Sequence, residues 1–72
     1  MYDRIRDLRE DADLKQRDLA RELKLHQTTY SSYELGKLNI PIPVLIQLAQ
    51  FYHTSVDYLL GLTNEKRPYP RA

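Results

Sequence analysis

The 72-residue chain contains no cysteine, so neither disulfides nor thiolate-bound metal ions can hold its fold together. A chain of this length can bury roughly 60% of the surface that its unfolded form exposes, which leaves room for one compact core. Hydrophobic residues make up 42% of the sequence, and their packing must supply the stability. We therefore expect one small domain, aided by self-association if packing within one copy falls short.

The spacing of the apolar residues predicts five short helices and an all-α fold. Ile5, Leu8 and Ala12 recur at i, i+3 and i+7, the spacing of one helical face, which places a first helix near residues 2–11. The other four helices are expected to begin near Gln16, Gln27, Pro43 and Ser55.

The end of the sequence differs in composition from the rest. Residues 64–72 show no apolar period, contain two prolines and carry an excess of basic side chains. We therefore expect an extended or disordered basic tail after a domain formed by residues 1–63. The most apolar stretch, residues 40–52, is interrupted by Pro and Gln and is too short to span a bilayer. A soluble, cytoplasmic protein without a membrane partner is expected.

The formal net charge is only +1, which counts mildly against a nucleic-acid partner because such proteins usually carry a strong basic excess. Basic and acidic side chains balance over residues 1–25, and residues 26–63 hold Lys37 against Glu34 and Asp57. If DNA is the partner, its phosphates must be attracted by a few placed cations, helix amino termini and backbone amides.

The sequence lacks the patterns that are typical of catalytic, metal and cofactor sites. Its two histidines, His26 and His53, lie on different segments and have no HExxH-like spacing. Its two glycines, Gly36 and Gly61, are expected to close helices, so no glycine-rich phosphate loop is present. We expect no enzyme activity, no metal ion, no cofactor and no small-molecule ligand.

Residues 14–39 are the most informative part of the sequence, with two predicted helices joined by a short turn. Ala20 is small enough to let these helices cross closely, and Tyr30 and Tyr33 can anchor the second helix on its inner face. The outer face of the second helix carries short hydrogen-bonding side chains, namely Gln27, Thr28, Ser31 and Ser32. Such side chains on a rigid helix can read base edges in the DNA major groove.

Over about residues 2–63 the sequence resembles the phage repressor and Cro-like (Xre-type) helix-turn-helix family. The resemblance rests on residues in four predicted helices, namely Ile5, Leu8, Arg9, Leu14, Gln16, Leu19, Ala20, Leu23, Tyr33, Glu34, Gly36, Lys37 and the ending SVDYLLG over residues 55–61. It implies a prokaryotic or phage DNA-binding regulator, most simply a repressor, that binds a pseudo-palindromic operator in double-stranded DNA as a homodimer.

The resemblance also implies residue roles. The recognition helix is expected over residues 27–35, with base-reading side chains at Gln27, Thr28, Ser31 and Ser32. The positions implied for DNA phosphate contacts are Gln16, Arg17, His26, Lys37 and Asn39. Arg9 and Glu34 match a buried ion pair that links the first helix to the third and has a structural role. The plain alternative for the polar positions is a solvated helix face.

Three positions depart from the family pattern. Lys15 and His26 stand where Ser or Thr usually caps the second and third helices, and Lys24 stands in the turn where Gly is usual. Each departure should cost about 0.5–2 kcal/mol of stability. His26 has three possible roles: a cap through its ring nitrogen, a phosphate contact, or none.

The carboxy-terminal third is apolar enough to suggest an interface. Between Ile40 and Leu62 the only formal charge is Asp57, so one apolar stripe per helix cannot hide all the apolar side chains. The candidates for a dimer interface are Ile42, Phe51, Val56, Tyr58 and Leu62. The alternative is that these side chains complete the core of one copy.

Two functions from different classes stay open. One is a free-standing DNA-binding regulator, and the polar face of residues 27–32 favours it. The other is a protein-interaction or antitoxin-like module with the same fold, which the low net charge leaves open.

Overall fold

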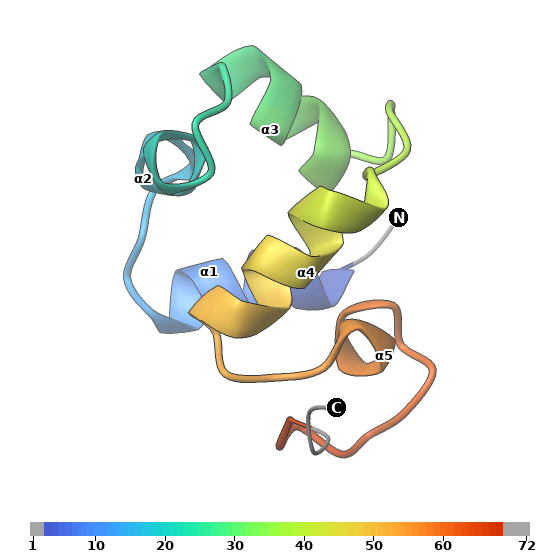
Figure 1. Ribbon diagram of the computed structural model, residues 1–72. Coiled ribbons are helices and arrows are strands. Elements are labelled where there is room, and N and C mark those ends of the chain that lie inside the picture. Colours follow the sequence, from blue (N-terminus) through green and yellow to red (C-terminus); the bar gives the residue numbers. More distant parts are fainter. Residues whose placement is uncertain (1–2, 69–72) are drawn as a thin grey trace.

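The computed structural model describes residues 3–68, and within that range it contains five helices and no strand. The helices are α1 (Asp3–Asp11), α2 (Gln16–Glu22), α3 (Gln27–Glu34), α4 (Ile42–Phe51) and α5 (Val56–Leu59) (Figure 1). The expected all-α fold with five short helices is confirmed. The predicted start of the first helix at Tyr2 lies outside the described residues.

The helices form two units joined through α1. The first unit is α2 packed on α3, the second is α4 with α5, and α1 contacts both α3 and α5 (Figure 1). Every helix contributes one large side chain that is fully buried, namely Ile5, Leu19, Tyr30, Leu48 and Leu59. Because each helix is anchored by one of these side chains, the five short elements share a single core.

All five helices end in the same way. In each, the second residue past the helix end has a positive φ, and the next residue donates its backbone N–H to a carbonyl five residues earlier. These closing bonds run from Leu14 to Arg9, Leu25 to Ala20, Lys37 to Ser32, Thr54 to Ala49 and Leu62 to Asp57. The arrangement satisfies carbonyls that the end of a helix leaves free.

Two of these five ends use glycine and three do not. Gly36 and Gly61 have φ values of 77° and 78°, so both glycines close helices as expected. Asp13, Lys24 and His53 take the same left-handed conformation with a side chain present, which costs more than glycine would. A glycine at position 24 would therefore adopt this conformation at a lower cost than Lys24 does.

The helix starts differ in how well they are capped. Ser55 caps α5, its hydroxyl accepting the Tyr58 N–H at 3.0 Å. The side chains of Lys15 and His26 make no cap hydrogen bond at α2 and α3, so a His26 ring cap is not formed. At α2 the Asp18 carboxylate instead accepts the Lys15 backbone N–H at 2.8 Å, which compensates in part.

Two sequence-based expectations need correction. Ala12 was placed on the inner face of the first helix, but α1 ends at Asp11 and Ala12 lies exposed in the turn that follows. The third helix was expected to extend to Leu35, which instead is its C-cap and is exposed. In both cases the helix closes before its apolar pattern ends, because the left-handed residue that follows stops it.

The segment after α5 contains no helix within residues 60–68 and contacts the domain at several points. The boundary predicted at residue 63 stays a prediction, and the last part of the predicted tail, residues 69–72, lies outside the described residues. Among residues 3–68, no helix has the length and apolar character needed to cross a membrane.

Candidate nucleic-acid interface

Helix α3 presents a polar face to solvent and buries the opposite face. Gln27 and Thr28 are exposed, and Ser31 and Ser32 are half-buried. On the other side Tyr30 and Tyr33 are buried in the core, so the helix is fixed along its length. The four predicted base-reading side chains thus all reach the surface of one short, well-anchored helix.

One of these four side chains is already engaged within the helix. The Ser32 hydroxyl donates to the Thr28 carbonyl oxygen at 3.0 Å, so it can only accept a further hydrogen bond. Gln27 makes no side-chain hydrogen bond within the described part of the chain and offers both a donor and an acceptor. Gln27 is the one amide among these four side chains, so it can present a donor and an acceptor from separate atoms.

A buried ion pair holds the far end of α3. Arg9 of α1 donates from Nε to Glu34 Oε2 at 2.7 Å and from Nη2 to Glu34 Oε1 at 3.2 Å, a two-pronged contact. The side chains are 13% and 3% exposed, respectively. The third Arg9 nitrogen, Nη1, donates to the Leu14 carbonyl oxygen at 2.9 Å. Arg9 thereby joins α1, the α1–α2 turn and α3.

The same carboxylate also holds the start of α2. Gln16 Nε2 donates to Glu34 Oε1 at 3.2 Å, which connects a predicted phosphate-contacting residue to the interior pair. The sequence did not indicate this bond, since Gln16 and Glu34 lie on different helices and a Gln at a helix start is common on surfaces. Glu34 therefore accepts hydrogen bonds from two helices at once.

The surroundings of Glu34 determine its charge state. Burial alone would raise its pKa, but the hydrogen bonds from Arg9 and Gln16 outweigh that effect and hold the pKa below its usual value. Burial raises the pKa of Tyr30 far above its usual value and that of Tyr52 to about 12. At neutral pH the two phenols are uncharged, and Glu34 is ionised beside Arg9.

The other predicted phosphate contacts are exposed side chains around α2 and α3, namely Arg17, His26, Lys37 and Asn39. Within residues 3–68, no carboxylate forms an ion pair with Arg17 or Lys37. Their charges are therefore available to an anion. In the same part of the chain, no cluster of His, Asp and Glu could hold a metal ion.

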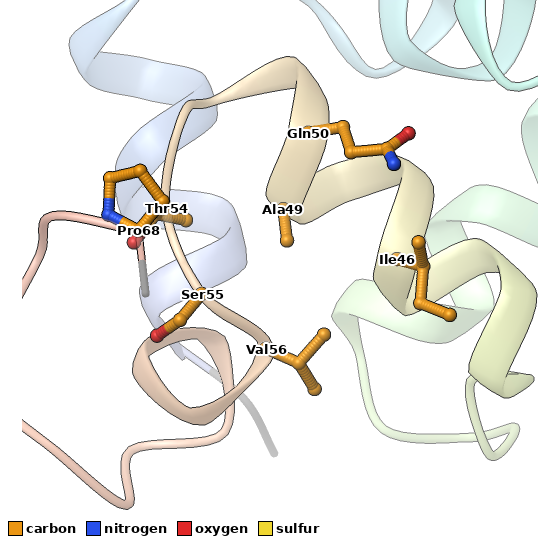
Figure 2. A pocket seen from close by; sticks show the side chains of 7 residues that line it. All are labelled: Ile46, Ala49, Gln50, Thr54, Ser55, Val56 and Pro68. Atoms are coloured by element: carbon orange, nitrogen blue, oxygen red, sulfur yellow. The ribbon is translucent and has the colours of Figure 1, made fainter. Parts of the chain in front are cut away.

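The five candidates for a dimer interface differ in exposure and in surroundings. Ile42 and Leu62 are 71% and 74% exposed. Phe51 borders a hollow with Glu22 and Leu23 of the α2 end. Val56 lines a different cleft, between α4 and α5 (Figure 2).

The fifth candidate, Tyr58, is half-buried, and its ring packs under the Arg4 guanidinium at 4.2 Å. Three further apolar side chains are exposed that the sequence interpretation missed, namely Leu35, Leu38 and Ile46. Ile46 follows Ile42 by one helical turn, which is a signal that could have identified it.

Comparison with known proteins gives consistent results. A helix-turn-helix family model matches residues 5–59. The chain is 37% identical over 65 residues to YobD, an uncharacterized HTH-type transcriptional regulator of Bacillus subtilis (strain 168), covering 90% of this chain and 58% of that protein. A crystal structure of a transcriptional regulator from Listeria innocua superposes with a TM-score of 0.81 at 30% identity, covering 89% of this chain and 60% of that one. The chain spans less than two thirds of either relative.

Proposed function

Because the chain belongs to the Xre/Cro-like helix-turn-helix family, we propose that it is a transcriptional regulator that binds double-stranded DNA through α3. The observation that carries this proposal is the construction of α3, which exposes Gln27 and Thr28 and is held from behind by Arg9 and Glu34. A recognition element needs both properties, since its side chains must reach base edges while its backbone keeps a fixed orientation.

Base recognition would come from the amino-terminal part of α3. Gln27 can form two hydrogen bonds to adenine, and the Thr28 methyl can contact a thymine methyl. Ser31 and Ser32 lie one turn further along, and Ser32 would serve as an acceptor only, since it already donates to Thr28. We therefore expect Gln27 to contribute most to sequence preference.

Phosphate contacts would flank this helix on both sides. Gln16, Arg17 and His26 lie before or at the start of α3, and Lys37 and Asn39 lie after it. With a net charge of only +1, the protein has no broad positive field, so each contact must contribute through its placement. The Gln16 bond to Glu34 keeps the amide of Gln16 in a defined position for this contact.

Repression by a dimer is the finer part of the proposal. One α3 covers half of a two-fold operator, and two copies would place their α3 helices about 34 Å apart, one turn of DNA. Ile42 and Leu62 are the most exposed interface candidates, with Phe51, Val56 and Tyr58 less so. A dimer bound to a promoter would repress by excluding the polymerase.

A gel-shift experiment tests the DNA-binding proposal. The protein is titrated against the DNA upstream of its own gene at two salt concentrations, with unrelated DNA as competitor. Gln27→Ala should lose about 1–3 kcal/mol of binding free energy on the preferred site and relax preference at one base pair. Lys37→Ala should weaken all sequences alike and lower the salt slope by about one unit. Equal, sequence-independent losses would remove the role of Gln27.

Sedimentation with and without a palindromic operator tests the dimer. Two protein chains per operator are expected, and Ile42→Asp should weaken the second binding step because a charge replaces an exposed apolar side chain. One chain per operator, unchanged by Ile42→Asp, would defeat the dimer and leave DNA binding standing.

A second candidate function is a protein-interaction or antitoxin-like module. The exposed apolar side chains of Leu35, Leu38, Ile42 and Ile46 favour it, because such side chains on a small domain suit a protein partner. The gel-shift experiment separates the two: a folded protein that prefers no sequence and has no salt-dependent affinity would favour this second function.

A further inference from the structure

The side chain of Arg4 fastens the chain that follows α5 to α1. Its Nη1 donates to the carbonyl oxygens of Tyr58, at 3.1 Å, and of Thr63, and its Nη2 donates to Asn64 Oδ1 at 2.7 Å. Its guanidinium also lies over the Tyr58 ring at 4.2 Å. One residue near the start of the described chain thus holds two points near its end.

A second attachment follows a few residues later. Thr54 is buried between α4 and α5, and its hydroxyl donates to the Lys66 carbonyl oxygen at 2.6 Å. Figure 1 shows the segment after α5 turning back beneath that helix toward the α4–α5 connection. Residues 63–68 therefore run across the domain between two fixed points, Arg4 and Thr54, and we name them the strap.

The strap ends at an apolar cleft between α4 and α5. The cleft has a volume of about 250 Å³ and is lined by Ile46, Ala49, Gln50, Thr54, Ser55, Val56 and Pro68. In Figure 2, Pro68 lies beside Thr54 at one end of the cleft, and Ile46 and Val56 lie toward the other end. The strap thus covers one end of the cleft, while Ile46 remains 45% exposed at the other.

We propose that the strap limits self-association by covering this cleft, and that its release opens the cleft to a second copy of the chain. The strap is suited to local release, because residues 64–68 are exposed and are held by a few hydrogen bonds rather than by buried side chains. Segments held in this way open at a lower free energy than the core.

A second copy is the occupant that the charges favour. Residues 40–62 carry Asp57 as their only formal charge, so two identical faces meet without strong repulsion. Ile42 and Ile46, one turn apart on α4, extend the apolar surface from the cleft toward solvent. The inference rests on the proposed function in one respect, since a two-fold operator gives such a dimer its use.

The test releases the strap in the full chain. Arg4→Gln removes the forked donor, and Thr54→Val removes the hydroxyl while keeping the side-chain shape. If the strap is open in about one molecule in ten, both copies of a symmetric dimer must open, so the double variant should self-associate up to about a hundredfold more tightly in sedimentation without DNA. Arg6→Gln is the matched control, because Arg6 lies on α1 and, among residues 3–68, forms ion pairs with Asp3, Asp7 and Glu10 of the same helix and not with the strap. It should leave self-association unchanged.

Two further measurements identify the released surface and confirm the release. Ile46→Asp added to the double variant should return it to the parent's self-association, whereas Gln47→Asp on the neighbouring hollow should not. Trypsin should cleave after Lys66 faster in the double variant than in the parent. A thermal melt establishes that both proteins are folded at the temperature of the test.

Every other result overturns the inference. Faster cleavage with unchanged or weaker self-association would show that the strap does not limit it, and unchanged cleavage would show that these bonds do not hold the strap. Because sedimentation is done without DNA, the gel-shift experiment remains independent. If the parent binds an operator but the double variant self-associates no more tightly, the strap inference alone is overturned. If the double variant self-associates more tightly but the protein binds no operator, the proposed DNA function alone is overturned.

Discussion

The α2–α3 unit and the α4–α5 unit are of similar size and share one core, but they distribute charge in opposite ways. In the first unit, Glu34 of α3 forms a buried ion pair with Arg9 of α1, and polar side chains such as Gln27 and Thr28 are exposed. The second has Asp57 as its only formal charge between residues 40 and 62 and leaves Ile42 and Leu62 in solvent.

The difference suggests a division of tasks within 72 residues. An exposed polar helix must keep its orientation, and α3 does so through two buried tyrosines, Tyr30 and Tyr33, together with the hydrogen-bonded Arg9–Glu34 pair. An apolar surface needs no such device, because shape and burial are sufficient for association. Removing a charged side chain is therefore expected to destabilise the first unit strongly. Replacing an exposed apolar side chain of the second unit is expected to change its stability little.

The largest effect should come from breaking the pair between α1 and α3. Arg9→Ala or Glu34→Ala leaves a buried charge without its partner and should cost about 3–5 kcal/mol of unfolding free energy, enough to unfold much of a small domain. Urea and thermal unfolding measure the loss. Glu10→Ala is the control, since Glu10 is exposed and its ion pair within the described part of the chain is with Arg6. Melting temperatures within a degree or two of the parent would contradict the structural role of the pair.

Acid should weaken the same pair without any substitution. The pKa of Glu34 is lower in the folded protein than its ordinary value of 4.5, so the folded state binds this proton less readily than the unfolded state. The contribution of Glu34 to stability is therefore fully present above that value and is lost as the pH falls through the lower folded-state pKa. Unfolding free energies measured between pH 7 and pH 3 should show this loss, and Glu65→Gln, on an exposed carboxylate, should not abolish it. An unfolding free energy that does not change over this pH range would contradict the lowered pKa of Glu34.

A gain in stability, smaller than the losses described above, is expected from a substitution in the turn between α2 and α3. Lys24 has a φ of 57°, a conformation that an L side chain disfavours by about 1–2 kcal/mol. Lys24→Gly should therefore raise the unfolding free energy by about 1 kcal/mol, after the greater flexibility of glycine in the unfolded chain is counted. Arg21→Gly, within α2, should lower it by a similar amount. No gain at Lys24 would show that the turn is not strained.

The smallest effect on folding is expected on the apolar unit. Ile42→Asp should change the unfolding free energy by no more than about 0.5 kcal/mol, because the side chain is largely in solvent. Leu48→Ala, on the buried face of the same helix, should cost about 2–5 kcal/mol. A large loss at Ile42 in a dilute, monomeric sample would show that the apolar surface supports the fold of one copy.

The sequence allowed the helices to be predicted well, since the apolar spacing placed buried side chains on their inner faces, such as Leu48 in α4 and Leu59 in α5. The end of the first helix was predicted at Asp11, where α1 does end, whereas the third helix was expected to reach Leu35, one residue past the end of α3 at Glu34, although Gly36 marks that end. Local pattern is thus sufficient for elements and insufficient for their last residues.

The candidate site was predicted unevenly. Arg9 and Glu34 were paired through the family resemblance alone, and the structure joins them at 2.7 Å. The roles of Gln27 and Lys37 toward DNA stay predictions. The contacts of Arg4 were not predicted, because two of its four partners are backbone carbonyls, which every residue supplies and no sequence pattern marks.

The position of the Arg9–Glu34 pair behind the exposed polar face of α3 has a consequence for how such a protein can diverge. Replacing either partner alone strands a charge in the core, so residues 9 and 34 can change only together, and this part of the chain is conservative by necessity. Gln27 and Thr28 are exposed and support no other residue, so they can be exchanged one at a time. Under the proposed function, new operator sequences would be accessible by single substitutions on this face that leave the scaffold intact.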